Sequence, residues 1–268
     1  MYLSVIIPAY NEEKRLPETL KKVRDFLNQQ KYTYEVVVVN DGSKDQTASV
    51  TSDWIKSQGD DHFRLIDNKI NQGKGAVVKQ GMLAAKGEWR LFMDADGSTD
   101  IKEIEKLFNF AISKQVNPHG VIPGETRDPG LDSRFRGNDK GSCYEVIIGS
   151  RYLDKRSIKI KQPLSRRIVS RLGNIIVRVV LGIKSVDTQC GFKLLSGKAS
   201  RDIFPKQTID RWGFDVEILA IAIKLGYKIK EVPVDWYDAE GSLVKKTAVF
   251  KTLKEIWQVK RNLMKGKY

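Results

Sequence analysis

The chain has 268 residues, of which 41% are hydrophobic and 30% charged, a balance typical of a soluble globular protein with one large α/β domain. Its two cysteines and two histidines exclude a disulfide framework and a cysteine-based zinc cluster, and they argue against Ser-His-Asp catalysis. The net charge is +14, and no apolar run approaches the ~18 residues that a membrane-spanning helix needs.

The first half of the sequence alternates short β-branched runs with helical patterns. Strands are predicted over Val5–Pro8, Glu35–Val39, Phe63–Ile66 and Trp89–Met93. Helices are predicted over Glu12–Gln30, Lys44–Lys56, Gly75–Ala85 and Ile101–Lys114. This alternation indicates a mostly parallel sheet flanked by crossover helices, with ligands expected at the carboxyl ends of the strands.

The second half contains fewer strands and more basic helices. We expect strands over Tyr144–Ile148 and Lys228–Trp236. Helices are expected over Pro163–Lys184, from Trp212 or Phe214 to Leu225, and over Lys245–Lys265. Residues 115–142 are rich in Pro, Gly and charge without apolar periodicity, so we interpret them as a surface insertion. The predicted organisation is one catalytic domain over 1–241, including the insertion, and a basic helical extension over 242–268.

The positive charge is concentrated in two segments. Residues 151–184 carry ten Lys or Arg against one acidic residue, and residues 242–268 carry eight against one. Such segments favour an anionic partner. Within Pro163–Lys184, apolar residues recur at three- and four-residue steps between arginines, which indicates either a basic amphipathic helix at a membrane surface or an ordinary helix packed on the core. No aromatic platform accompanies the arginines, so nucleic acid is not expected as a partner.

The triplet Asp94-Ala95-Asp96 follows a predicted buried strand. Two carboxylates this close repel each other unless a cation lies beside them, and oxygen ligands suit Mg²⁺ or Mn²⁺ completed by water and a substrate diphosphate. The structural alternative is that Asp96 or Ser98 caps the helix that begins near Ile101.

Two further polar segments follow predicted strands. Asp41 lies in a turn after a run of four valines, where it either accepts hydrogen bonds from a base or ribose or simply shapes the turn. Lys74, between Gly73 and Gly75, opens a predicted helix whose N–H groups suit a phosphate. The surrounding residues match neither a phosphate-binding P-loop nor a dinucleotide fingerprint.

Six segments follow one another along the chain: Ser4–Glu13, Val39–Ser43, Gly73–Gly75, Asp94–Asp96, Gly149–Arg151 and Asp187–Lys193. Together they resemble the family 2 glycosyltransferases of the GT-A fold. The last segment, with Arg211–Glu217 and Val232–Trp236, is similar to the dolichyl-phosphate β-glucosyltransferase branch, and the dolichyl-phosphate mannose synthases are the nearest competitor. The resemblance implies a Rossmann-like, mostly parallel GT-A sheet.

The resemblance also implies roles for the matching positions. Residues expected to bind the nucleotide sugar are Pro8, Tyr10, Glu12, Asp41, Lys74, Asp94, Ala95, Asp96, Gln189, Trp212 and Asp215. Residues expected at the reaction itself are Asp94, Asp96, Asp187 and Arg151, with Asp94 and Asp96 holding Mg²⁺ or Mn²⁺. Residues expected to meet the acceptor or the membrane are Arg151, Arg156, Arg166, Arg167 and Arg171.

The resemblance implies a metal-dependent, inverting transfer of a hexosyl group, glucose from UDP-glucose, to a polyprenyl or dolichyl phosphate. The alternatives are a mannose synthase that uses GDP-mannose, a soluble family 2 enzyme that acts on a glycan hydroxyl, and a basic surface-binding protein with a degenerate pocket. Because Met1–Pro8 lack an export signal, we expect a cytoplasmic protein, peripheral at the inner face of an anionic membrane. Whether an integral membrane partner assists stays open.

Overall fold

The computed structural model describes residues 1–111, 143–154, 156–159, 164–238 and 248–268, with the side chains of 164–172 and 248–250 outside the description. The predicted insertion at 115–142 therefore lies outside the described residues. So do the side chains of three of the arginines predicted to meet the acceptor or membrane, namely Arg166, Arg167 and Arg171.

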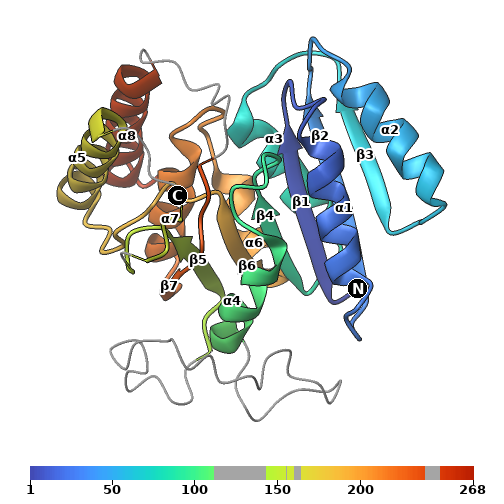
Figure 1. Ribbon diagram of the computed structural model, residues 1–268. Helices are drawn as coiled ribbons and strands as arrows, with labels where there is room; N and C mark the ends of the chain where they lie inside the picture. Colours follow the sequence, from blue (N-terminus) through green and yellow to red (C-terminus); the bar gives the residue numbers. More distant parts are fainter. Residues whose placement is uncertain (112–142, 155, 160–163, 239–247) are drawn as a thin grey trace.

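A seven-stranded sheet forms the centre of the described part (Figure 1). Its strands are β1 (Leu3–Ala9), β2 (Tyr34–Asp41), β3 (Phe63–Asn68), β4 (Trp89–Met93), β5 (Val146–Ser150), β6 (Phe192–Ser196) and β7 (Ile229–Pro233). The spatial order is β3-β2-β1-β4-β6-β5-β7. Strand β6 pairs antiparallel with both β4 and β5, and every other pairing is parallel, which confirms the mostly parallel sheet.

Helices cover both faces of the sheet (Figure 1). They are α1 (Leu16–Leu27), α2 (Thr47–Gln58), α3 (Lys74–Ala84), α4 (Ile104–Ala111), α5 (Leu164–Leu181), α6 (Gly197–Ile203), α7 (Phe214–Lys224) and α8 (Ala248–Met264), with 3₁₀ turns η1 (Ile101–Glu103) and η3 (Phe204–Lys206). One apolar cluster packs α1 and α4 on one face, and a second packs α3, α6, α7 and α8 on the other. Because both faces are covered, β1 and β2 are buried along their whole length, which explains their continuous apolar runs.

The predicted elements are present with shifted ends. The first helix begins at Leu16 rather than Glu12, because Pro17 sits in its first turn and residues before it form a turn instead. The predicted helix from Ile101 is a 3₁₀ turn followed by α4. Strand β6 was not predicted, because Lys193 interrupts its short apolar run. Helix α6, which follows it, was not predicted either.

Helix α8 packs against α5 and α7, and its residues Ile256 and Val259 lie in the same apolar cluster as α7. The division of the chain at 241/242 stays a prediction. Among the described helices, none is both long enough and apolar enough to cross a membrane.

Candidate active site

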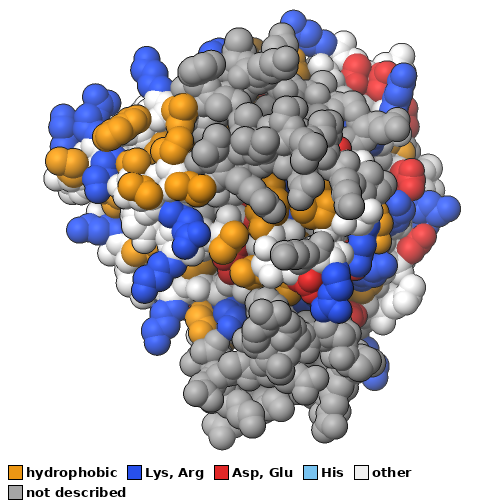
Figure 2. Space-filling view, turned by 60° about the vertical axis from the view of Figure 1, so that its left-hand side comes forward, with side chains coloured by type: hydrophobic (Ala, Val, Ile, Leu, Met, Phe, Trp, Pro, Cys, Tyr) orange, Lys and Arg blue, Asp and Glu red, His pale blue; other side chains and the backbone are white. Residues whose placement is uncertain are grey.

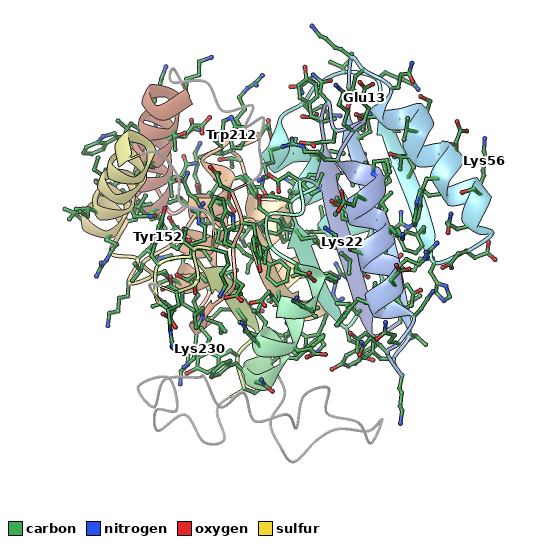
Figure 3. The ribbon with its side chains drawn as sticks, viewed as in Figure 1. Glu13, Lys22, Lys56, Tyr152, Trp212 and Lys230 are labelled. Carbon is green, nitrogen blue, oxygen red and sulfur yellow. The ribbon has the colours of Figure 1, made fainter. Side chains whose placement is uncertain are left out.

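The sheet topology brings the predicted residues to one edge. Strands β1, β2, β4 and β5 run in the same direction, so the loops that follow them share an edge. Strand β6 runs the opposite way, with Phe192 opposite Met93, and therefore the loop that precedes it reaches the same edge. In Figure 3, Glu13 after β1 and Trp212 before α7 both lie at this upper edge of the molecule.

Asp94 and Asp96 follow β4 directly, as predicted. The Asp94 N–H donates to Gly191 O at 3.1 Å, and the Asp94 carboxylate forms an ion pair with Lys74, with Oδ1 2.6 Å from Nζ. A Cβ at Gly191 would overlap the Asp94 carboxylate, so glycine is required there. Asp96 accepts a hydrogen bond from the Ser98 N–H at 3.0 Å. The cap of the next helical turn is Asp100, so the alternative that Asp96 or Ser98 serves as that cap is wrong.

Lys74 is the first residue of α3 and faces the centre of the site. Its Nζ lies 5.5 Å from the centroid of the Trp212 ring as well as beside Asp94. Burial alone would lower the pKa of Lys74, but the negative charges of Asp94 and Asp215 outweigh burial and raise it above its ordinary value. The ammonium group therefore supplies a permanent positive charge at the N-terminus of α3, where the helix dipole also favours a phosphate.

Asp41 at the end of β2 is buried and is bonded to the loop that leads into α3. Its Oδ1 accepts hydrogen bonds from the Gln72 N–H at 2.7 Å and the Gly73 N–H at 3.2 Å, and Asn71 Nδ2 donates to its Oδ2 at 2.9 Å. Burial raises the pKa of Asp41 despite these donors. The carboxylate thus holds the loop before Lys74, and its contact with a base or ribose stays a prediction.

The loop after β1 is tied to the loop after β2. Pro8 is buried near the end of β1, Tyr10 is half-buried beyond it, and the Asn11 N–H donates to Ser43 Oγ at 3.0 Å. The Glu12 carboxylate pairs with Arg15 at 2.6 Å. Burial raises the pKa of Glu12 against the opposing effect of Arg15, and the charges of Asp96 and Asp94 raise it further.

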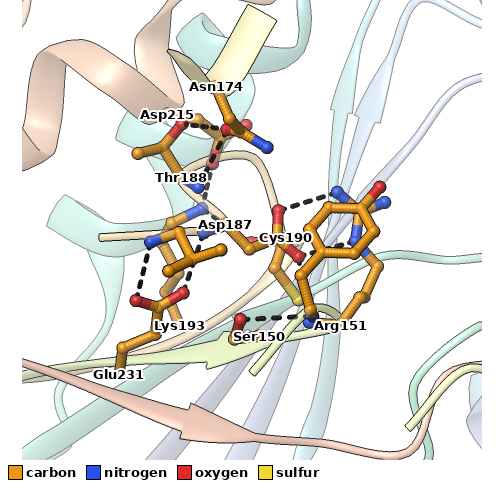
Figure 4. Close-up of polar contacts among 11 residues, drawn as sticks. Ser150, Arg151, Asn174, Asp187, Thr188, Cys190, Lys193, Asp215 and Glu231 are labelled. Atoms are coloured by element: carbon orange, nitrogen blue, oxygen red, sulfur yellow. Dashed lines mark hydrogen bonds and ion pairs between the residues drawn. The ribbon is translucent and has the colours of Figure 1, made fainter. Parts of the chain in front are cut away.

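Arg151 and Asp187 form a bidentate pair (Figure 4). Arg151 Nε lies 2.7 Å from Asp187 Oδ2, Nη2 lies 2.8 Å from Oδ1, and the Arg151 N–H also donates to Oδ2 at 3.0 Å. Burial alone would raise the pKa of the fully buried Asp187, but the charge and hydrogen bonds of Arg151 outweigh it and lower the pKa. Asp187 therefore orients Arg151, and contact of either residue with a substrate stays a prediction.

Beneath this edge lies a second buried pair, between Lys193 of β6 and Asp215 of α7 (Figure 4). Lys193 also donates to Cys190 O at 2.6 Å, in the turn that carries Gly191 against Asp94. Lys193 is part of the segment Asp187–Lys193 that resembles the family, but no role for it was predicted. The available signal was a lysine inside an apolar strand, since a buried lysine requires a carboxylate. Asp215, which the family resemblance places among the residues that bind the nucleotide sugar, is 3% exposed.

The remaining predicted residues divide into two groups. Ala95 is buried in the loop after β4, and Gln189 is half-buried in the loop before β6. Both lie at the same edge, because both loops reach it. Arg156 is exposed and pairs with Asp154 at 2.9 Å.

The residues present fit a divalent cation that is completed by a substrate. No group of three or more His, Cys, Asp or Glu side chains that could hold a metal ion occurs within the described ranges. Asp94 and Asp96, however, supply partly exposed carboxylates at the open edge of the sheet. Mg²⁺ and Mn²⁺ are commonly bound by one or two carboxylates together with water and substrate phosphates.

The sequence is similar to those of several dolichyl-phosphate beta-glucosyltransferases. The chain is 38% identical over 250 residues to a dolichyl-phosphate beta-glucosyltransferase of Dictyostelium discoideum, covering 90% of this chain and 68% of that protein. It is 37% identical over 249 residues to the Saccharomyces cerevisiae protein of the same name, covering 90% and 69%.

Among solved structures, glucosyl-3-phosphoglycerate synthase from Mycobacterium tuberculosis in complex with UDP is similar, with a TM-score of 0.62, 14% identity, and coverage of 97% of this chain and 80% of that chain. Another structure of that synthase contains Mn²⁺ and UDP. At this identity the likeness concerns the fold, and it confirms the predicted GT-A architecture. Residues 4–204 match the sequence profile of Glycosyl transferase family 2. With that match and these relatives, the chain belongs to glycosyltransferase family 2.

Proposed function

We propose that the protein transfers glucose from UDP-glucose to a polyprenyl phosphate of the dolichyl type, with inversion at the anomeric carbon. The observation that carries the proposal is the 38% identity to a dolichyl-phosphate beta-glucosyltransferase over 90% of this chain. The arrangement of Asp94, Lys74 and Arg151 at one sheet edge supports it, because two anionic reactants must be held there together.

The proposed chemistry asks little of a general base. A phosphate monoester with a second pKa of ~6 is already largely ionised at neutral pH, so its oxygen attacks the anomeric carbon directly. The leaving nucleoside diphosphate needs positive charge, which Lys74 provides at the N-terminus of α3. Mg²⁺ or Mn²⁺ held by Asp94 and Asp96 would neutralise the diphosphate further. Arg151, held by Asp187, is available for a phosphate of the acceptor or donor.

A docking surface for an anionic membrane is part of the proposal. It consists of exposed apolar side chains on α5 and α8, with exposed basic side chains on the same face of α8. The apolar members are Ile175, Val179, Trp257 and Met264, and the basic members are Lys254 and Arg261. Figure 1 shows α5 and α8 side by side, and Figure 2, turned so that this side comes forward, shows hydrophobic side chains among basic ones.

This combination is suited to acidic lipid headgroups, because apolar side chains enter the interface while lysines and arginines meet phosphates. Trp257 is 63% exposed and Val179 is 79% exposed, so both are available to a bilayer. We therefore infer that the protein is peripheral at the inner, cytoplasmic face of the membrane. An integral membrane partner is not required by this arrangement.

The test is transfer of labelled glucose from UDP-glucose to a polyprenyl phosphate in anionic liposomes, with Mg²⁺ or Mn²⁺. We expect a lipid-linked product that is lost with a chelator and reduced at least a hundredfold by Asp94→Asn, because the variant loses a carboxylate that would hold the divalent cation and that fixes Lys74. A parallel reaction with GDP-mannose separates the mannose synthase alternative. Absence of lipid-linked sugar with every donor and metal would contradict the proposal.

A further inference from the structure

One acidic side chain of α8 reaches the start of α7. Glu255 Oε2 accepts a hydrogen bond from the Gly213 N–H at 2.7 Å, immediately before α7 begins at Phe214. A Cβ at Gly213 would lie 2.7 Å from the Glu255 Cβ, so the approach depends on glycine. A carboxylate at this end of a helix is also favoured by the helix dipole. Glu255 therefore fixes the point at which the preceding loop enters α7.

That loop, residues 207–213, packs on the first turn of α3. The Ala76 N–H donates to Asp210 O at 3.1 Å, and Gln207 Nε2 donates to Gly75 O at 3.0 Å. A Cβ at Gly73 would overlap Asp210 O, which shows how closely the two backbones approach. The loop thus forms one wall beside the N-terminus of α3.

The same loop carries Trp212 to the candidate active site. The Trp212 ring lies 5.5 Å from Lys74 Nζ, which in turn contacts the Asp94 carboxylate at 2.6 Å. Trp212 is half-buried, and it directly precedes Gly213, whose N–H donates the hydrogen bond to Glu255. A shift at Gly213 would therefore move the ring relative to Lys74.

The beginning of the loop has a different anchor. The fully buried Glu217 accepts hydrogen bonds from the Thr208 N–H at 3.0 Å and the Ile209 N–H at 2.8 Å, and Tyr268 Oη donates to it at 2.5 Å. Glu217 holds residues 208–209 from within α7 itself. Farther along the loop, Asp210 O accepts from the Ala76 N–H of α3, and Gly213 O accepts from the Glu217 N–H at 3.1 Å in the first turn of α7. The contact with α8 adds the hydrogen bond at the Gly213 N–H, next to Trp212.

We propose that Glu255 is a positioning residue for the donor site, holding residues 210–213 so that Trp212 stays beside Lys74. The proposal rests on the proposed function, since it takes UDP-glucose as the ligand. It assigns to α8 a direct part in shaping the donor pocket, at a point 42 residues along the chain from Gly213. Glu255 acts through the loop and does not itself contact the donor.

The experiment compares three full-length variants with the unmodified protein. Glu255→Met keeps the volume but removes the acceptor, and Glu255→Gln keeps a carbonyl oxygen that can still accept from Gly213. Glu145→Met is the matched control. Glu145 is half-buried and accepts a hydrogen bond from Ser196 Oγ at 3.2 Å, but it precedes β5 at the opposite edge of the sheet.

Two quantities are measured for each variant. Amide hydrogen exchange of peptides covering 207–214 reports whether the loop is held, and calorimetry gives the affinities for UDP-glucose and UMP with Mn²⁺. For Glu255→Met we expect faster exchange in 207–214 and about tenfold weaker binding of UDP-glucose. Tenfold is the usual size of effect when one hydrogen bond to a charged group is lost, here the bond between the Gly213 N–H and Glu255. Binding of UMP should change by less than about twofold, because UMP lacks the glucosyl group and the second phosphate. Glu255→Gln should bind nearly as the parent does, and Glu145→Met should match it.

Each result decides a specific point. Unchanged exchange in Glu255→Met, or faster exchange with parental UDP-glucose affinity, would overturn the positioning role. If Glu255→Met does not fold, Gly213→Ala gives the same test from the other side of the contact, because the added Cβ displaces Glu255. Failure of the unmodified protein to bind UDP-glucose would overturn the proposed function, and with it the role of Glu255 at a UDP-glucose site. The exchange data would still show separately whether Glu255 holds the loop.

Discussion

Asp94, Asp187 and Asp215 each face a basic side chain from a different element. Their partners are Lys74, Arg151 and Lys193, respectively. The charges of Asp187 and Asp215 are buried and therefore must be paired, while the partly exposed Asp94 is paired with Lys74, so the three pairs hold the edge of the sheet in one arrangement before any substrate binds. Such an arrangement suits electrostatic stabilisation, because the charges need no reorganisation during the reaction.

The Arg151–Asp187 pair makes a prediction about stability and pH. In the folded state the pKa of Asp187 is lowered, so its contribution to stability is present above the unfolded-state pKa of ~3.9 and is lost as the pH falls through the lower folded-state pKa. Asp187→Asn should therefore cost about 3–5 kcal/mol at pH 7, because Arg151 is left unpaired, and the difference should shrink below about pH 4. Urea unfolding between pH 2.5 and 7 measures this. As a control, the exposed Asp25→Asn should change stability by less than about 0.5 kcal/mol at every pH.

Part of the candidate site could be predicted from the sequence. Asp94 and Asp96 follow β4, so a local pattern placed them at the sheet edge, whereas Arg151 and Asp187 were singled out by the family resemblance. Lys193 and Glu255 received no role, because their partners lie 22 and 42 residues away along the chain. Only tertiary packing brings such pairs together, and hydrophobic periodicity carries no information about it.

At the scale of elements, the parallel half of the sheet was predictable because β-branched runs alternate with crossover helices. Strand β6 escaped prediction, yet it is the element that completes the site. By running antiparallel between β4 and β5, it brings the loop that contains Asp187 and Gln189 to the carboxyl edge. A single reversed strand thus adds a seventh loop to the six that the parallel strands form at this edge.

The exposed face of helix α8 leads to a prediction at this scale. The double variant Trp257→Gln and Met264→Gln should bind vesicles containing anionic lipid at least tenfold more weakly, since each exposed side chain loses apolar burial in the interface. Binding of the parent should also weaken with added salt, because Lys254 and Arg261 act through screened charges. Co-sedimentation measures both effects. Ile223→Gln on α7, which is 46% exposed, is the control, and equal loss in that variant would contradict the docking surface.

At the scale of the whole molecule, the residues on either side of 112–142 lie together. Cys143 Sγ donates to Ala111 O at 2.6 Å, and the Tyr144 N–H donates to Phe110 O at 3.0 Å. These two hydrogen bonds connect the end of α4 directly to the segment that leads into β5. This closure is the geometry expected where a segment is inserted between two neighbouring elements.

Replacing residues 112–142 by a linker of about four residues should therefore preserve the fold. Shortening the loop about eightfold, three doublings, reduces the entropy cost of closing it by on the order of 2 kcal/mol, so the melting temperature should stay the same or rise slightly. Glucosyl transfer should be unchanged, since the candidate site lies at the other edge of the sheet from the start of β5.

Removing residues 248–268 instead should unfold the protein or lower its melting temperature by well over 10 °C, because Ile256 and Val259 fill the apolar cluster shared with α7. Differential scanning calorimetry of the two deletions separates a tolerated insertion from an integral helix, and equal loss of stability in both would mean that residues 112–142 contribute to the core.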